Sequence, residues 1–158
     1  MQTLVDSYSV HFRFSQRFDF PAEEAFRWCT DYASGDLVLM GDEGHRKVER
    51  VNEDTFILTD DFETKQGRVT KEKMVRIYPE RLSWTNTRIS FDGKFSQFLY
   101  QMVAEGKGGS RLDFTGSQIF PGKSPGKARL TAMARQLVKE DSESWRNLAR
   151  AMAEDLSR

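Results

Sequence analysis

The chain has 158 residues, the usual length of one domain, and we expect residues 1–158 to fold as a single unit with a substantial core. Charged residues make up 30% and aromatic residues 12% of the sequence, a composition that argues against a disordered or membrane-embedded chain. The 24 basic and 24 acidic residues cancel, so no overall field attracts nucleic acid, and no apolar run of about 18 residues could cross a membrane.

The first residues bear on location. The start, Met1 to Asp6, lacks the basic and then apolar layout of a signal peptide, so we expect a cytoplasmic protein. The lone cysteine, Cys29, cannot form an internal disulfide.

A strand and a short helix open the chain. Between Tyr8 and Phe20 every even position except Gln16 is apolar, and this period of two predicts a strand with one buried face. Pro21 then suits a first helical turn, and Glu23 and Glu24 suit the positive end of a helix dipole. A second turn of helix is predicted near residues 37–40.

Six further strands are predicted between short turns. Their ranges are 47–51, 55–63, 68–78, 82–90, 95–104 and 110–120. Because the links are too short for crossover connections, neighbouring strands should be antiparallel.

One long amphipathic helix ends the chain. Ser124 is a good N-cap and Pro125 a good first helical residue, and apolar residues then recur at helical spacing as far as Leu156. About 30 residues at 1.5 Å each make a rod of roughly 45 Å, long enough to cross a whole sheet.

This order of elements resembles the helix-grip fold of the START/polyketide-cyclase superfamily, which includes the major birch-pollen allergen. The resemblance is carried by residues 18–26 (FDFPAEEAF), by residues 75–84 (VRIYPERLSW), by residues 109–116 (GSRLDFTG) and by the terminal helix. It implies an α+β fold in which a curved seven-stranded antiparallel sheet surrounds the long helix, with two short helices after the first strand. It also implies a cavity for an apolar or amphipathic small molecule.

The sequence offers little for metals or cofactors. His11, His45 and Cys29 have no metal-binding spacing, and no phosphate-binding or dinucleotide-binding motif occurs, so we expect neither a metal nor a cofactor. The loop of residues 42–45 could hold a cation, with a solvated turn as the alternative. Cys29 lies on an apolar helix stripe and is interpreted as a small buried residue.

Two charged residues occupy positions where the strand pattern calls for apolar ones. Asp60 is in phase with Phe56, Leu58 and Phe62, and Arg88 is in phase with Trp84. A charge facing a low-dielectric cavity must be paired or bind something. Asp60 and Arg88 could pair with each other or hold the polar end of a ligand. Alternatively, a bulge could turn both outward, or both could lie at the solvent-exposed rim of the sheet.

Aromatic residues supply the predicted cavity wall. We expect Trp84, Tyr100, Phe114 and Trp145 to bind the apolar part of a ligand, with Asp60 and Arg88 as its polar anchors. Tyr100 could also be a general acid, or simply part of the core. Gly116 could leave room for a ligand or mark a bend. Asp141, which interrupts the apolar stripe of the long helix, could face the cavity mouth or turn outward.

These features favour binding of a small hydrophobic or amphipathic molecule, such as a lipid. A cyclase or dehydratase that uses Asp60 or Tyr100 as acid or base and Arg88 to hold an oxyanion is the enzyme alternative. A protein-interaction module, like relatives that activate a chaperone ATPase, is the other. Its contact surface could be the charged side of the long helix (Arg135, Lys139, Glu143, Arg146, Arg150).

Overall fold

A computed structural model of the chain describes residues 6–32, 36–41, 43–89 and 94–158. The strands are β1 (Ser7–Phe18), β2 (His45–Asn52), β3 (Thr55–Thr64), β4 (Gly67–Tyr78), β5 (Ser83–Ile89), β6 (Phe95–Glu105) and β7 (Gly109–Pro121). The helices are α1 (Ala22–Cys29), α2 (Asp36–Leu39), a single 3₁₀ turn η1 (Pro79–Arg81), and α3 (Lys127–Leu156). All seven predicted strands and the three predicted helices are confirmed. Residues 90–93, most of the link predicted between the strands 82–90 and 95–104, lie outside the described residues.

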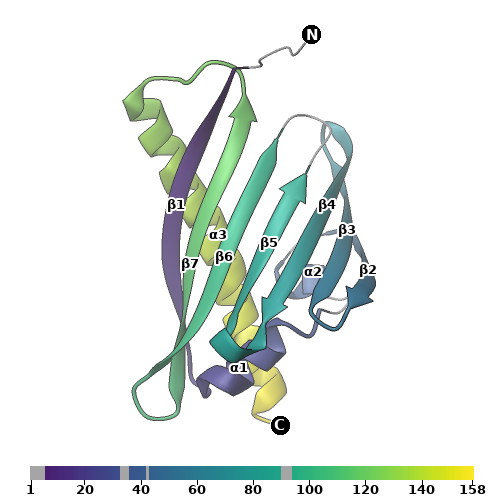
Figure 1. Ribbon diagram of the computed structural model, residues 1–158, viewed down its shortest axis with the longest axis vertical. Coiled ribbons are helices and arrows are strands. Elements are labelled where there is room, and N and C mark those ends of the chain that lie inside the picture. The colour runs from purple at the N-terminus through teal and green to yellow at the C-terminus, as the bar shows by residue number, and fades with distance from the viewer. Residues whose placement is uncertain (1–5, 33–35, 42, 90–93) are drawn as a thin grey trace.

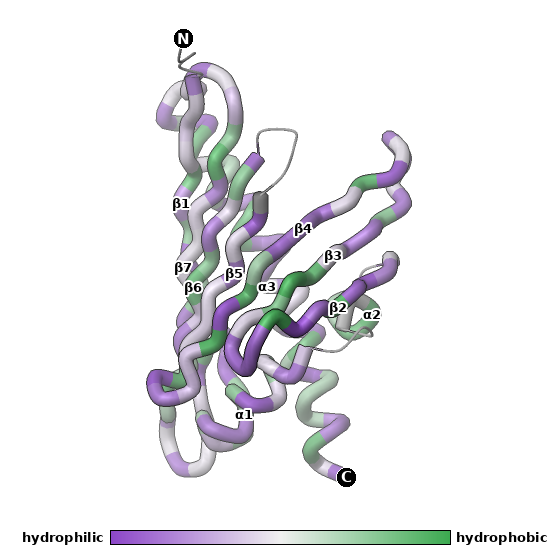
Figure 2. The backbone as a smooth tube through the Cα atoms, turned by 45° about the vertical axis from the view of Figure 1, so that its right-hand side comes forward, coloured by the Kyte–Doolittle hydropathy of each residue, from purple (hydrophilic) through white to green (hydrophobic). Residues whose placement is uncertain are grey.

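The strands form one antiparallel sheet in the order β1-β7-β6-β5-β4-β3-β2. Chain neighbours pair along most of the sheet, whereas β1 crosses to pair with β7, from Ser7 opposite Pro121 to Phe18 opposite Ser110. Helices α1 and α2 fill the connection from β1 to β2, which lie at opposite edges. The sheet curves, so that in Figure 2 β2 and β3 point away from β1 and β7.

Helix α3 lies along the concave face of this sheet (Figure 1). It packs against β1, and its second half buries Trp145, Leu148 and Met152. The charged residues predicted on its far side are all exposed (Arg135, Lys139, Glu143, Arg146, Arg150). No helix among the described residues is long and apolar enough to span a membrane.

Two of the predicted element boundaries that differ from the structure are explained by backbone conformation. Helix α3 begins at Lys127, not at Pro125, because Gly126 has an extended conformation (ψ 160°) and is itself the N-cap. Strand β5 begins at Ser83, not at Leu82, because Leu82 closes the 3₁₀ turn with a left-handed backbone (φ 48°).

The inner sheet face follows the predicted alternation. On β3 the residues Phe56, Leu58 and Asp60 are buried, and the only register shift in its pairing with β2 falls near Arg50. The alternative of a bulge that turns Asp60 outward is therefore wrong.

Candidate functional site: a cavity between the sheet and the long helix

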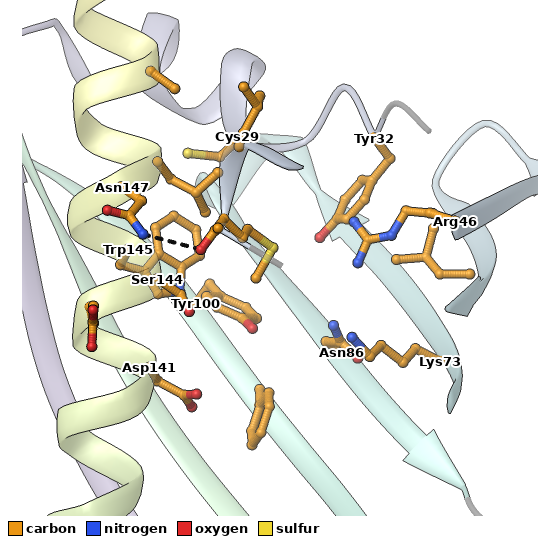
Figure 3. Close-up of a pocket in the computed structure, with 18 of the residues that line it drawn as sticks. Cys29, Tyr32, Arg46, Lys73, Asn86, Tyr100, Asp141, Ser144, Trp145 and Asn147 are labelled. Carbon is orange, nitrogen blue, oxygen red and sulfur yellow. Dashed lines mark hydrogen bonds between the residues drawn. The ribbon is translucent and has the colours of Figure 1, made fainter. Parts of the chain in front are cut away.

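A cavity of about 820 Å³ lies between α3 and the inner face of the sheet. Strands β3 to β7 supply its floor, the C-terminal half of α3 one side, and α1 with the segment after it another. Figure 3 shows side chains from these elements pointing into a common space. A volume of this size falls within the range of small-molecule sites in proteins.

Aromatic rings form one wall of the cavity. The rings of Trp84 and Tyr100 stack with centroids 4.8 Å apart and planes 5° from parallel. Trp145 of α3 approaches both rings, at 6.3 Å from Trp84 and 5.6 Å from Tyr100. All three side chains are at least nine-tenths buried and line the cavity, so the wall is packed before any ligand arrives.

Four of the six predicted ligand-binding residues line the cavity: Trp84, Arg88, Tyr100 and Trp145. Phe114 does not line the cavity; it lies beside Tyr100 on the neighbouring strand β7, with the two ring centroids 5.2 Å apart. Asp60 does not line the cavity either and has no exposed surface.

Asp60 belongs to a buried ion-pair cluster. Arg46 donates two hydrogen bonds to its carboxylate, from Nε to Oδ1 (2.7 Å) and from a terminal nitrogen to Oδ2 (2.8 Å). Lys73 donates a third, from Nζ to Oδ2 (2.9 Å). Burial raises the pKa of the Asp60 carboxyl, but the bonds from Arg46 and the charge of Lys73 outweigh it, so the pKa lies below 3.8. Asp60 is therefore ionised at neutral pH.

Asp60 pairs with these two residues instead of Arg88, which the sequence had offered as one possible partner. Arg46 stands directly opposite Asp60 on the neighbouring strand β2, and Lys73 lies on the other neighbour, β4. Arg88 is on β5, one strand further away. The residues on the two adjacent strands are therefore the ones close enough to bond the Asp60 carboxylate.

Lys73 and Arg46 face the cavity on their other side, because both line it. Burial lowers the pKa of the Lys73 amine, and the nearby charges of Arg46 and Arg88 act in the same direction, while Asp60 opposes them. Arg88 directly faces Lys73 across the β4–β5 pair. The Arg88 Nε is buried and has no hydrogen-bond partner among the described residues.

The helix side of the cavity is polar. Asp141 lines the cavity, together with Ser144 and Asn147, so it faces inward (Figure 3). The Asn147 amide donates to the Met40 carbonyl (3.2 Å), and the Trp28 indole donates to Asp155 (2.9 Å). These two bonds hold the segments after β1 against α3.

Tyr100 keeps its proton at neutral pH. Burial raises its pKa well above 10, and the nearby Tyr32 and Asp141 add to this effect. Its hydroxyl could donate a hydrogen bond to a ligand in the cavity. A hydroxyl that holds its proton so strongly is a weak general acid.

Gly116 leaves room for aromatic side chains of the protein itself. A Cβ at this position would lie 2.7 Å and 2.8 Å from two ring carbons of Phe114 and 3.0 Å from the Phe12 ring. The prediction that Gly116 could make space for a ligand was therefore wrong, since these rings fill the space.

The histidines, the cysteine and the loop considered for metal binding do not come together in one site among the described residues. His11 is exposed and bonds Ser9, and His45 is exposed at the start of β2. Cys29 is half-buried and lines the cavity. Asp42, part of the loop suggested for a cation, lies outside the described residues. In the described part of the chain, no group of three potential metal ligands occurs.

The sequence did not identify Arg46 and Lys73 as residues of the site. A signal existed for Lys73, which is in phase with the buried Val75 and Ile77 on β4. Arg46 was missed because the second strand was predicted to start one residue later, at Lys47.

The chain resembles known proteins in its fold, not in its sequence. No family model and no curated protein matches the sequence. Among solved structures, the Zhui aromatase/cyclase from Streptomyces sp. R1128 superposes with a TM-score of 0.74 at 10% identity, covering 96% of this chain and 97% of that one. The chain has the helix-grip fold.

Two further structures with the helix-grip fold extend the comparison. Norcoclaurine synthase from Thalictrum flavum, solved with dopamine and hydroxybenzaldehyde, has a TM-score of 0.70 at 10% identity, with 98% of each chain covered. A START superfamily protein from Mycobacterium smegmatis has a TM-score of 0.68 at 9% identity, with 90% and 99% covered. At these identities the likeness concerns the fold.

Proposed function

We propose that this protein binds a small amphipathic molecule in the cavity between the sheet and α3. The observation that carries the proposal is an 820 Å³ cavity with a wall built from the stacked rings of Trp84 and Tyr100 and the tilted ring of Trp145. Charged and polar side chains also line the cavity, so a ligand with one apolar and one polar part fits the lining best. A lipid-like ligand and a cytoplasmic location remain part of this proposal.

The structural neighbours support it in general terms. Their names include an aromatase/cyclase, and a synthase solved in complex with dopamine and hydroxybenzaldehyde. The present chain shares their fold at about one-tenth identity, so the ligand must be found by experiment.

A neutral fluorescent probe, phenylnaphthylamine, tests the proposal. We expect saturable binding at one site per chain, with a negative heat-capacity change in calorimetry because apolar surface is buried. Binding with no saturation, or with many equivalent sites, would contradict the proposal.

A matched pair of helix variants locates the probe. Ala151 lines the cavity from α3, and Ala151→Phe should fill part of it and weaken the probe by about tenfold or more. Ala132 is exposed on the same helix, and Ala132→Phe should leave affinity unchanged. Equal effects of the two variants would place the probe outside the cavity.

An enzyme acting in the same cavity is the second candidate. The observation that favours it is the convergence of Lys73, Tyr100 and Asp141 on one space, with the pKa of the Lys73 amine lowered by burial. A small amount of protein incubated with the small-molecule extract of its own host distinguishes the two. A binder depletes at most its own molar quantity of a compound, whereas an enzyme converts many equivalents.

A further inference from the structure

The inner sheet face is layered by polarity along the strands. Nearest α1, one row of paired positions is apolar and mostly aromatic: Ile77, Trp84, Tyr100 and Phe114. Four residues further along the same strands, the paired positions are polar: Lys73, Arg88, Ser96 and Gln118. All four members of this polar row line the cavity.

The spacing of the two rows determines the distance between the apolar and polar parts of a ligand that contacts both. Residues four apart in a strand lie about 13 Å apart along its axis. A ligand that contacts both Trp84 and Arg88 must therefore place its polar end about that far from its apolar end.

The charge of the polar row is positive and incompletely balanced. Asp60 accepts its hydrogen bonds from Arg46 and Lys73, so it already has two cationic partners. Arg88 adds a third cation beside Lys73. The other two residues of the row, Ser96 on β6 and Gln118 on β7, are uncharged. The carboxylates that line the cavity come from α3 and the segment after α1, outside this row (Asp31, Glu140, Asp141, Glu143, Glu154, Asp155). The charge of Asp141 acts on Tyr100, in the aromatic part.

The guanidinium of Arg88 contains a buried hydrogen-bond donor that is not satisfied by the described residues. The Arg88 Nε has no hydrogen-bond partner in the described part of the chain. A buried donor left without a partner destabilises the folded chain, and more so when it is charged. An acceptor supplied by a ligand would remove that cost and also reduce the repulsion between Arg88 and Lys73.

We propose that the ligand is an anionic amphiphile whose carboxylate, or a similar acidic group, binds Arg88 beside Lys73 while its apolar body lies against Trp84, Tyr100 and Trp145. This inference rests on the proposed function and specifies the chemistry of the ligand. A cationic head group would be repelled by Arg88, and an uncharged apolar one would leave the Nε donor unpaired.

Dodecanoate and dodecanol test the charge requirement, because they share one alkyl chain and differ in the head group. Each is used to displace phenylnaphthylamine from the wild-type protein. We expect dodecanoate to bind about ten- to a hundredfold more tightly than dodecanol, the range for a hydrogen bond to a charged group.

Variants assign that preference to Arg88. Arg88→Met should abolish the preference for the acid while leaving dodecanol affinity unchanged, and Arg88→Lys should retain part of it. Arg76→Met is the matched control, because Arg76 is exposed on the opposite face of the neighbouring strand β4. Thermal melting of each variant, without ligand, shows whether it is folded. If Arg88→Met does not fold, Arg88→Lys and the wild-type comparison still decide.

Three outcomes separate a failure of this inference from a failure of the proposed function. If both compounds displace the probe with equal affinity, the anionic preference is wrong and the cavity remains a binding site. If Arg88→Met weakens both compounds equally, Arg88 has only a structural role, and the inference is again wrong. If phenylnaphthylamine itself does not bind, the proposed function fails.

Discussion

The two halves of the inner sheet face bury their side chains by different means. In the aromatic region (Trp84, Tyr100, Phe114, Trp145) rings pack on rings, with centroids 4.8 to 6.3 Å apart. In the ionic region (Arg46, Asp60, Lys73, Arg88) one carboxylate is surrounded by cations. Apolar burial stabilises without requiring a particular partner, whereas a buried charge is tolerated only when its partners are in place.

The comparison teaches where a ligand is needed. The aromatic region is complete by itself, because its rings contact one another. The ionic region is complete at Asp60 and incomplete at Arg88, whose Nε lacks a partner within the described residues. The two regions border the same cavity, so one molecule can contact both.

The largest expected effect is in the ionic region. Asp60→Asn leaves Arg46 and Lys73 buried without their counter-charge, and we expect a loss of about 3–5 kcal/mol in the free energy of unfolding, measured with urea. Asp113→Asn is the control, because Asp113 pairs with Arg111 at a site where its side chain is 41% exposed, and should lose less than about 1 kcal/mol. Equal losses would mean that the burial of Asp60 carries no special energetic weight.

Acid should act on the same carboxylate. Because the pKa of Asp60 is lower in the folded state than its ordinary 3.8, its stabilising contribution is complete above that pH and is lost as the pH falls below it. The wild-type protein should therefore lose stability in this range more steeply than Asp60→Asn, which has no carboxyl to protonate. Parallel curves for the two proteins would contradict this assignment.

The aromatic region should respond to truncation. Trp145→Ala removes a side chain that is 8% exposed and contacts Trp84, Tyr100 and Phe18. We expect a loss of about 3 kcal/mol, the lower end of the range for this truncation, since the vacated space joins an existing cavity. Thermal and urea unfolding measure it. A loss below about 1 kcal/mol would show that α3 contributes little to this wall.

A smaller effect is expected behind the aromatic region. Gly116→Ala forces a Cβ against the Phe114 and Phe12 rings, and should reduce stability by about 1–3 kcal/mol. Gly126→Ala is the matched control, because a Cβ there meets no atom within 4 Å. If Gly116→Ala is as stable as the control, the rings move aside freely and the aromatic region is less tightly packed than described.

The smallest expected effect is a change in stability at alkaline pH, caused by loss of the Tyr100 hydroxyl proton. Because burial raises the pKa of Tyr100 well above 10, the unfolded state loses this proton first and stability falls as the pH rises above 10. Tyr100→Phe should show a shallower decline between about pH 10 and 11. Tyr78→Phe, at an exposed position, is the control. A decline as steep in Tyr100→Phe as in the wild-type protein would show that Tyr100 is accessible to solvent.

Much of the fold could be predicted because its signals are local. The alternation from Tyr8 to Phe20 and the apolar spacing up to Leu156 each identify an element without reference to the rest of the chain. The same alternation placed Asp60 and Arg88 on the inner face. Boundaries set by backbone conformation, such as the left-handed Leu82, had no comparable signal.

The partners within the site could not be predicted, because they depend on strand order and register. Asp60 meets Arg46 and Lys73 only because β2 and β4 flank β3 with those residues at or beside the same level. Charged residues such as Lys73 usually lie on the surface, so an inward position in the pattern was easily passed over. The orientation of Asp141, toward the cavity or toward solvent, depends on the path of α3 across the sheet and could not be predicted from the sequence.

The position of β1 at the edge beside β7 also has a consequence for how the chain acquires its structure. Strand β1 is synthesised before β7, and the two pair from Ser7 with Pro121 to Phe18 with Ser110, so β1 stays unpaired until β7 has been made. Pairing over such separations slows folding, and an unpaired apolar strand promotes aggregation in the meantime. The nascent protein should therefore depend on chaperones until β7 and α3 have emerged, and rapid dilution from denaturant should show a slow phase that Val10→Ala or Phe12→Ala affects.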